Sequence, residues 1–176
     1  MNLLRWKTAI KRPAAYESYG QTRTGDVSNI IIHCSATPPG GYINNADRID
    51  VMHRTQNGWD GIGYHFVIRE DGTVEGGRPL SRTAAAATGW NNDVWHICLI
   101  GGLDDDHKPG DTYTPKQWES LEDLVKALQD TAINDGYGIL GVLGHRDVDP
   151  MKACPCFDVP QWWSGVLKKN DDEIPF

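Results

Sequence analysis

Short apolar runs that each end in a polar or glycine-rich stretch constrain the fold of this chain more than any other feature. Three of them, at 29–33, 95–100 and 139–143, are rich in isoleucine, leucine and valine. Runs of this length and composition are typical of buried β-strands, because they are too short for helices and do not alternate between polar and apolar residues. We therefore expect a sheet whose strands are covered by other elements.

Helical patterns and turns separate these runs. A first helix is predicted to begin near Asn45, and a second is predicted to begin at Thr114, which has the sequence of an N-terminal cap, and to end at Gly136. Two further strands are predicted at 64–69 and 73–75, joined by a tight turn. The order strand-helix-strand-strand-strand-helix-strand predicts an α/β fold in which a mixed central β-sheet is flanked by helices.

The length of 176 residues is that of a single domain with little to spare. Residues 1–27 show no sustained periodicity, so we expect them to form an N-terminal extension or loosely docked arm. The domain itself is expected over 28–168, followed by an acidic tail at 169–176. No run approaches the roughly 20 apolar residues of a membrane span. The N-terminus also lacks the apolar segment of a signal peptide.

The formal net charge of −7 argues against direct binding of nucleic acid or anionic membranes. The four cysteines are too few for a fold built on disulfides. Cys34 and Cys98 lie inside apolar runs, and we interpret them as small core residues. The chain is thus expected to be a soluble, acidic, single-domain protein.

Two histidines stand at the polar ends of predicted strands, His33 after the first and His145 after the last. The proline-containing loop after His145 brings Lys152 and Cys154 back towards the same strand end. Two imidazoles and one thiolate suit zinc and leave a fourth position for water, as catalytic zinc sites do. A single histidine at a strand end is more often structural, so it is the combination that indicates a metal. Cys156 remains an alternative sulfur ligand.

Four longer segments identify a protein family more specifically than the spacing of these residues does. They are HCSAT at 33–37, GWDGIGYHFVIREDGTVEGGR at 58–78, ICLIGG at 97–102 and HRDVDPMKACPCFD at 145–158. In order and separation they resemble the small bacteriophage lysozymes that are N-acetylmuramoyl-L-alanine amidases, whose fold is shared by the peptidoglycan recognition proteins. The resemblance extends over residues 28–165, which is most of the chain.

The resemblance implies one Zn2+ bound by His33, His145 and Cys154. It also implies hydrolysis of the amide between the lactyl group of N-acetylmuramic acid and L-alanine in peptidoglycan. Tyr64 matches the catalytic tyrosine near the zinc-bound water, and Lys152 matches a lysine of the same site. Both can donate hydrogen bonds to a developing oxyanion. Which of them, or a metal-bound hydroxide, delivers the proton to the leaving amine stays open.

Three positions depart from the pattern of the phage relatives. Ala86 stands where they usually carry a histidine, Met151 is an extra residue between the second and third ligands, and His96 replaces a small residue without an evident role. A substrate contact is therefore missing or supplied by neighbouring residues. The candidates for contacts with the polar glycan and its peptides are Trp59, Trp90, Asn91 and Asn92.

The remaining histidines are expected to be structural or solvated. We expect His53 and His65 to pack or to form hydrogen bonds, and His107 to be solvated in a charged loop. Because His65 follows Tyr64 on a predicted strand, it should point to the face opposite the site.

These inferences predict a monomeric phage or prophage endolysin that is stored in the host bacterial cytoplasm and acts on the cell wall after release. One alternative is a non-catalytic peptidoglycan-binding module, although such modules typically lose the thiolate ligand that Cys154 supplies here. Another is an amidase that also regulates an intracellular phage or host protein, such as a polymerase, through its basic N-terminal arm.

Overall fold

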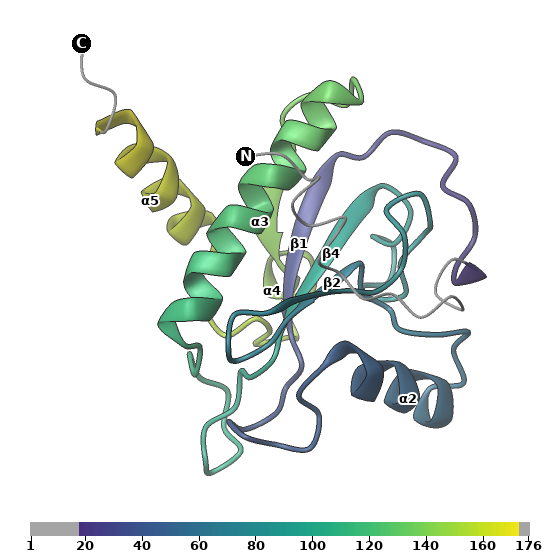
Figure 1. Cartoon of the computed structure of the whole chain (residues 1–176), viewed down its shortest axis with the longest axis vertical. Coiled ribbons are helices and arrows are strands. Elements are labelled where there is room, and N and C mark those ends of the chain that lie inside the picture. Colours follow the sequence, from purple (N-terminus) through teal and green to yellow (C-terminus); the bar gives the residue numbers. More distant parts are fainter. Residues whose placement is uncertain (1–17, 173–176) are drawn as a thin grey trace.

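A mixed sheet of five strands forms the centre of the molecule, in the order β3-β2-β4-β1-β5 (Figure 1). The computed structural model describes residues 18–172. The strands are β1 (Asn29–Cys34), β2 (Phe66–Ile68), β3 (Val74–Gly76), β4 (Val94–Leu99) and β5 (Gly141–Gly144). Strands β1, β2, β4 and β5 are parallel, and β3 pairs with β2 in the antiparallel sense. The predicted fold class, a mixed sheet flanked by helices, is confirmed.

Two helices cover the sheet. They are α2 (Ala46–Gln56) and α3 (Pro115–Asn134), and both begin where the sequence predicts. Asn45 caps α2 by accepting a hydrogen bond from the backbone N–H of Arg48. Thr114 and Gln117 form a reciprocal capping box at α3. Two more helices, α4 (His145–Val148) and α5 (Val159–Asp172), were not expected, although Asp158 caps α5 by accepting from the backbone N–H of Gln161.

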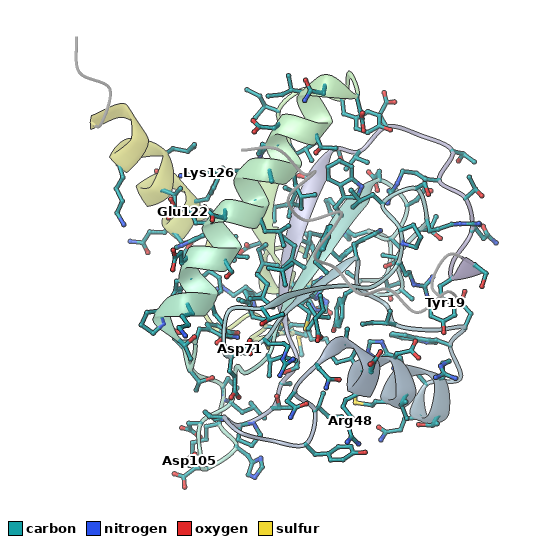
Figure 2. All side chains as sticks on the ribbon, viewed as in Figure 1. Tyr19, Arg48, Asp71, Asp105, Glu122 and Lys126 are labelled. Carbon is teal, nitrogen blue, oxygen red and sulfur yellow. The ribbon has the colours of Figure 1, made fainter. Side chains whose placement is uncertain are left out.

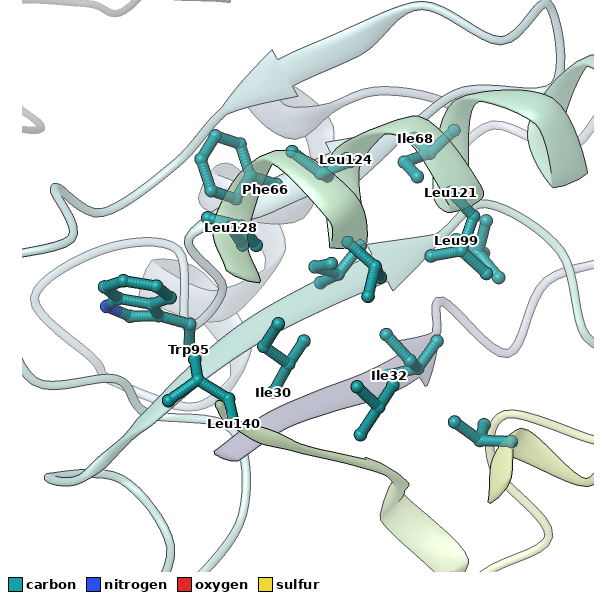
Figure 3. Packing of buried hydrophobic residues seen from close by; sticks show 14 of the residues in the cluster. Ile30, Ile32, Phe66, Ile68, Trp95, Leu99, Leu121, Leu124, Leu128 and Leu140 are labelled. Atoms are coloured by element: carbon teal, nitrogen blue, oxygen red, sulfur yellow. The ribbon is translucent and has the colours of Figure 1, made fainter. Parts of the chain in front are cut away.

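The main core lies between the sheet and α3 (Figure 3). Alternate residues of the strands face the apolar side of the helix. The core residues are therefore spaced two apart in the strands and three or four apart in the helix. The fully buried side chains shown there include Ile30, Ile32, Phe66, Ile68, Trp95, Leu99, Leu121, Leu124 and Leu128. The same alternation sends His33 to the other face of β1.

A smaller core covers that other face. Its buried members, drawn from the sheet, α2 and nearby loops, are Tyr19, Ala46, Ile49, Ile62, Val67, Cys98 and Ile100. Tyr19 belongs to this cluster, and Figure 2 shows it near α2. Cys34 and Cys98 are both buried, as predicted, and all four cysteines are free.

The segment before β1 is packed on the domain over the part that is described. Thr22 forms a β-bridge with Arg82. The Arg23 guanidinium donates to the carbonyls of Leu80, Arg82 and Val94. Of the arm expected at 1–27, residues 1–17 lie outside the described residues. Of the expected tail, residues up to Asp172 belong to α5, and the rest lies outside. Within residues 18–172, no helix is long and apolar enough to cross a membrane.

Candidate metal centre

The metal centre is positioned by two neighbouring parallel strands, β1 and β5. His33 is the penultimate residue of β1, and His145 directly follows β5. Because parallel strands end at the same edge of a sheet, the two imidazoles meet there, with ring centroids 4.7 Å apart. Cys154 joins them, and the nitrogen and sulfur atoms of the three side chains lie within 4.8 Å of one another. The structure thus brings together the three predicted ligands.

The backbone holds the sulfur of this set. The N–H of Cys34 donates to Sγ of Cys154 over 3.1 Å. The loop is closed by the N–H of Arg146, which donates to the Cys154 carbonyl over 2.7 Å. The sulfur lies 4.0 Å from Nδ1 of His33. Nδ1 is therefore the His33 nitrogen that faces the sulfur.

Cys156 occupies a different environment from Cys154. Its Sγ donates to the carbonyl of Gly102 over 3.1 Å. A hydrogen bond with the Cys34 side chain and then burial raise the pKa of Cys156, so its thiol stays protonated. Among the described residues, the group that is able to hold a metal contains Cys154 and not Cys156.

Both ligand histidines are neutral at pH 7. Burial, followed by the neighbouring imidazoles of His96 and His145, lowers the pKa of His33 well below its ordinary value. Burial and then the charge of Lys152 lower the pKa of His145. A neutral imidazole keeps a lone pair, so both rings are in the form that binds a metal.

Tyr64 lies beside the metal set. Its ring centroid is 5.2 Å from that of His33 and 5.5 Å from that of His53. Burial, and then the nearby sulfur atoms of Cys98 and Cys154, raise the pKa of Tyr64 well above its ordinary value. The hydroxyl is therefore protonated at neutral pH and is able to donate a hydrogen bond.

Lys152 is exposed on the loop between the second and third ligands. It is close enough to His145 for its charge to lower the pKa of that histidine. Met151, the extra residue noted in the sequence, is 89% exposed. Met151 therefore lies at the surface of the loop, while the backbone bond between Arg146 and Cys154 closes its base.

The four residues expected to contact substrate have different surroundings. Trp59 is exposed and packs against His53, with ring centroids 4.7 Å apart. The side-chain oxygen of Asn91 accepts from the backbone N–H groups of Ala86 and Ala87, so it is engaged within its own loop. Trp90 is half-buried on that loop.

The loop also contains Asn92, which is exposed and whose backbone carbonyl accepts from Arg23. Ala86 is part of this bonded loop through its backbone N–H, which donates to the side-chain oxygen of Asn91.

His96 and His65 lie on the same face of the sheet as His33. Nδ1 of His96 is 2.8 Å from Nε2 of His33, and the His65 and His96 rings stack with centroids 6.0 Å apart. The prediction that His65 points to the opposite face is wrong. The reason is that β2 begins at Phe66, so strict alternation does not extend back to Tyr64. His96 was missed because only the pairing of β4 with β1 makes it a neighbour of His33.

The mixed α/β fold gathers two imidazoles and a thiol at the carboxyl edge of its parallel strands, and such a group of side chains is able to hold a metal ion. Residues 23–157 match the N-acetylmuramoyl-L-alanine amidase family. This chain therefore belongs to that family, and the predicted amidase class is confirmed.

Similar proteins agree with this assignment. The endolysin of Enterobacteria phage T3 is 41% identical over 134 residues, which is 76% of this chain and 83% of that protein. The endolysin of Escherichia phage T7 is 40% identical over 134 residues, with the same 76% and 83% coverage. Among solved structures, an endolysin amidase from Clostridium intestinale has a TM-score of 0.65 at 28% identity, covering 88% of this chain and 93% of its own.

Proposed function

We propose that this chain is a zinc-dependent N-acetylmuramoyl-L-alanine amidase that acts on peptidoglycan as an endolysin. The observation that carries the proposal is the group formed by His33, His145 and Cys154, whose ligand atoms lie within 4.8 Å of one another. The names of the phage relatives support the role in lysis.

The donor set fits zinc. Two neutral imidazoles and one thiolate are typical zinc ligands. The ligand atoms of the three side chains lie within 4.8 Å of one another, so these residues would hold the ion together. When bound, the ion lowers the pKa of a coordinated water to about 7 and polarises the scissile carbonyl.

The surrounding side chains supply the rest of the chemistry. Amide hydrolysis needs a donor for the oxyanion and a proton for the leaving amine. Tyr64 is suited to the first task because its hydroxyl stays protonated beside His33. The exposed ammonium of Lys152 is suited to binding the anionic tetrahedral centre from the solvent side, or to giving the amine its proton.

The substrate contacts proposed are Trp59, Trp90, Asn91 and Asn92. Exposed Trp59 offers an aromatic face for a sugar ring, and it belongs to the same aromatic group as Tyr64 through His53. On the other loop, Asn91 orders the backbone from which Trp90 and Asn92 project.

We propose that the enzyme is a monomer that accumulates in the host bacterial cytoplasm and reaches the wall after release. A purely binding module is disfavoured, because the sulfur ligand and Tyr64 are both present. Regulation of an intracellular partner through the basic arm stays a prediction, since most of that arm lies outside the described residues.

Mass spectrometry of digested peptidoglycan tests the proposal. We expect free stem peptides that begin with L-alanine, and one zinc per chain in carefully purified protein. New reducing sugar ends would instead identify a glycosidase, and wild-type protein that neither retains nor binds zinc would overturn the metal assignment.

A further inference from the structure

A chain of three hydrogen-bonding groups runs from the metal centre into the protein. Nε2 of His33 lies 2.8 Å from Nδ1 of His96. Nε2 of His96 lies 2.8 Å from the backbone carbonyl of Trp90. Both imidazoles are buried, at 1% and 0% exposure.

The backbone carbonyl of Trp90, at the inner end of this series of hydrogen bonds, determines which ring nitrogens carry protons. A carbonyl oxygen only accepts, so Nε2 of His96 carries a proton and donates it to Trp90. A neutral imidazole carries a proton on only one ring nitrogen, so Nδ1 of the buried His96 ring is an acceptor. Nε2 of His33 must then be the donor across the 2.8 Å contact.

This arrangement leaves Nδ1 of His33 unprotonated, with its lone pair free. That nitrogen is the one that lies 4.0 Å from Sγ of Cys154. Metal-binding histidines commonly donate their other ring N–H to a second group, which fixes the tautomer and the ring orientation. In this chain the second group is another histidine, His96.

We propose that His96 is a positioning residue that holds His33 as the Nε2–H tautomer, with Nδ1 presented to the metal. The inference rests on the proposed zinc function and deepens it. His96 also connects His33 to the loop that carries Trp90, because Nε2 of His96 donates to the backbone carbonyl of Trp90. Asn91 holds the same loop through the N–H groups of Ala86 and Ala87, so the final acceptor is itself fixed.

His65 provides an internal contrast. It is also a fully buried imidazole on the same face, and it stacks on His96. Its Nδ1 accepts from the backbone N–H of His96, and its Nε2 lies 3.0 Å from the carbonyl of Arg82 and 3.4 Å from a guanidinium nitrogen of Arg23. Replacing His65 therefore removes a buried imidazole without removing the acceptor for His33.

The experiment compares His96→Asn with His96→Leu. The two new side chains have nearly the same shape, but only asparagine keeps an acceptor oxygen close to the place of Nδ1. Zinc dissociation constants are measured by chelator competition at constant pH. Loss of a group that orients a metal ligand typically weakens affinity by about 10- to 100-fold. We expect such a loss in His96→Leu, most of it restored in His96→Asn, and less than about threefold in His65→Asn.

A second readout does not depend on zinc or on activity. In metal-free wild-type protein, 15N NMR should show His33 protonated at Nε2 and unprotonated at Nδ1, and His96→Leu should lose this preference. The inference is overturned if His33 carries its proton on Nδ1, or if His96→Leu binds zinc as tightly as wild type. Equal losses in His96→Leu and His65→Asn would also overturn it, since general destabilisation would then explain both. Wild-type protein that does not bind zinc would overturn the proposed function, and the NMR measurement would still establish the tautomer of His33.

Discussion

The backbone N–H of Cys34 donates a hydrogen bond to Sγ of Cys154 over 3.1 Å, across 120 positions of sequence. Cys34 directly follows His33, so consecutive residues of β1 supply one proposed metal ligand and the donor that holds another. A strand in the middle of a sheet is a rigid support, because both of its edges are paired. Ligands held on a rigid support lose little freedom when they bind an ion, which reduces the entropic cost of binding.

Replacement of Cys154 by serine should weaken zinc binding strongly and abolish amidase activity while the fold persists. A hydroxyl is a poor substitute for a thiolate ligand, since its proton is not released at neutral pH. Zinc content, circular dichroism and peptidoglycan digestion check this outcome. Cys156→Ser is the matched control, and it should retain zinc because its thiol donates to Gly102. Full activity with bound zinc in Cys154→Ser would show that the ligand assignment is wrong.

Replacement of Tyr64 by phenylalanine should lower kcat by about 100- to 1,000-fold, the effect of removing one oxyanion donor. The ring still packs between His33 and His53, so zinc affinity and thermal stability should change little. Steady-state kinetics with purified peptidoglycan, run beside zinc titrations, separate the two effects. A variant that loses zinc together with activity would point to a structural role.

Replacement of Lys152 by methionine should reduce turnover by about 10- to 100-fold, because a cation next to the reacting amide stabilises developing negative charge. Its charge also lowers the pKa of His145, so the variant should have a higher His145 pKa in the metal-free form. NMR titration measures that shift independently of catalysis. Lys116→Met, at an exposed position in α3, is the control and should leave both quantities unchanged.

Stability of the metal-free protein should fall as pH decreases from about 6.5. Burial lowers the pKa of His53 to about 4 and that of His65 well below its ordinary value. Below about pH 6.5 the unfolded chain therefore binds more protons than the folded chain. Each histidine lowers the free energy of unfolding by about 1.4 kcal/mol per pH unit between its unfolded-state and folded-state pKa values. The His53 contribution is complete above about 6.5 and lost by about 4.

Urea unfolding between pH 7 and pH 4.5 measures this slope. The His53→Asn variant keeps an acceptor for the N–H of Gly63, which His53 Nδ1 now binds over 3.0 Å, and removes the titrating group. Its stability should therefore fall less steeply than that of wild type. Parallel curves for the two proteins would contradict the assignment to His53.

Replacement of Arg23 by methionine should destabilise the protein by about 1–3 kcal/mol, since it removes a cationic donor from several backbone carbonyls. It should also raise KM, because the Arg23 guanidinium donates to the backbone carbonyl of Asn92, a proposed substrate contact. Arg69→Met is a suitable control: Arg69 forms surface ion pairs with Asp71 and Glu75, and pairs of this kind are worth about 0–1 kcal/mol. Equal losses of unfolding free energy in the two variants would contradict a specific stabilising role for Arg23.

Local sequence patterns predicted most of the secondary structure. The apolar run at 29–33 became β1, and the cap at Thr114 began α3, because period and capping depend on residues that are close in sequence. The helix α5 was missed even though Asp158 caps it, and the ends of β2 were overextended. Strand ends depend on pairing partners, which a single strand does not reveal.

The sequence by itself determined the identity of the donors, since residue types and the resemblance singled out His33, His145 and Cys154. Only the tertiary structure decided how they are held. The contact of His33 with His96 follows from the pairing of β1 with β4, and the contact of Cys34 with Cys154 follows from the return of a distant loop. Both are contacts between residues far apart in the chain, and no local period encodes them.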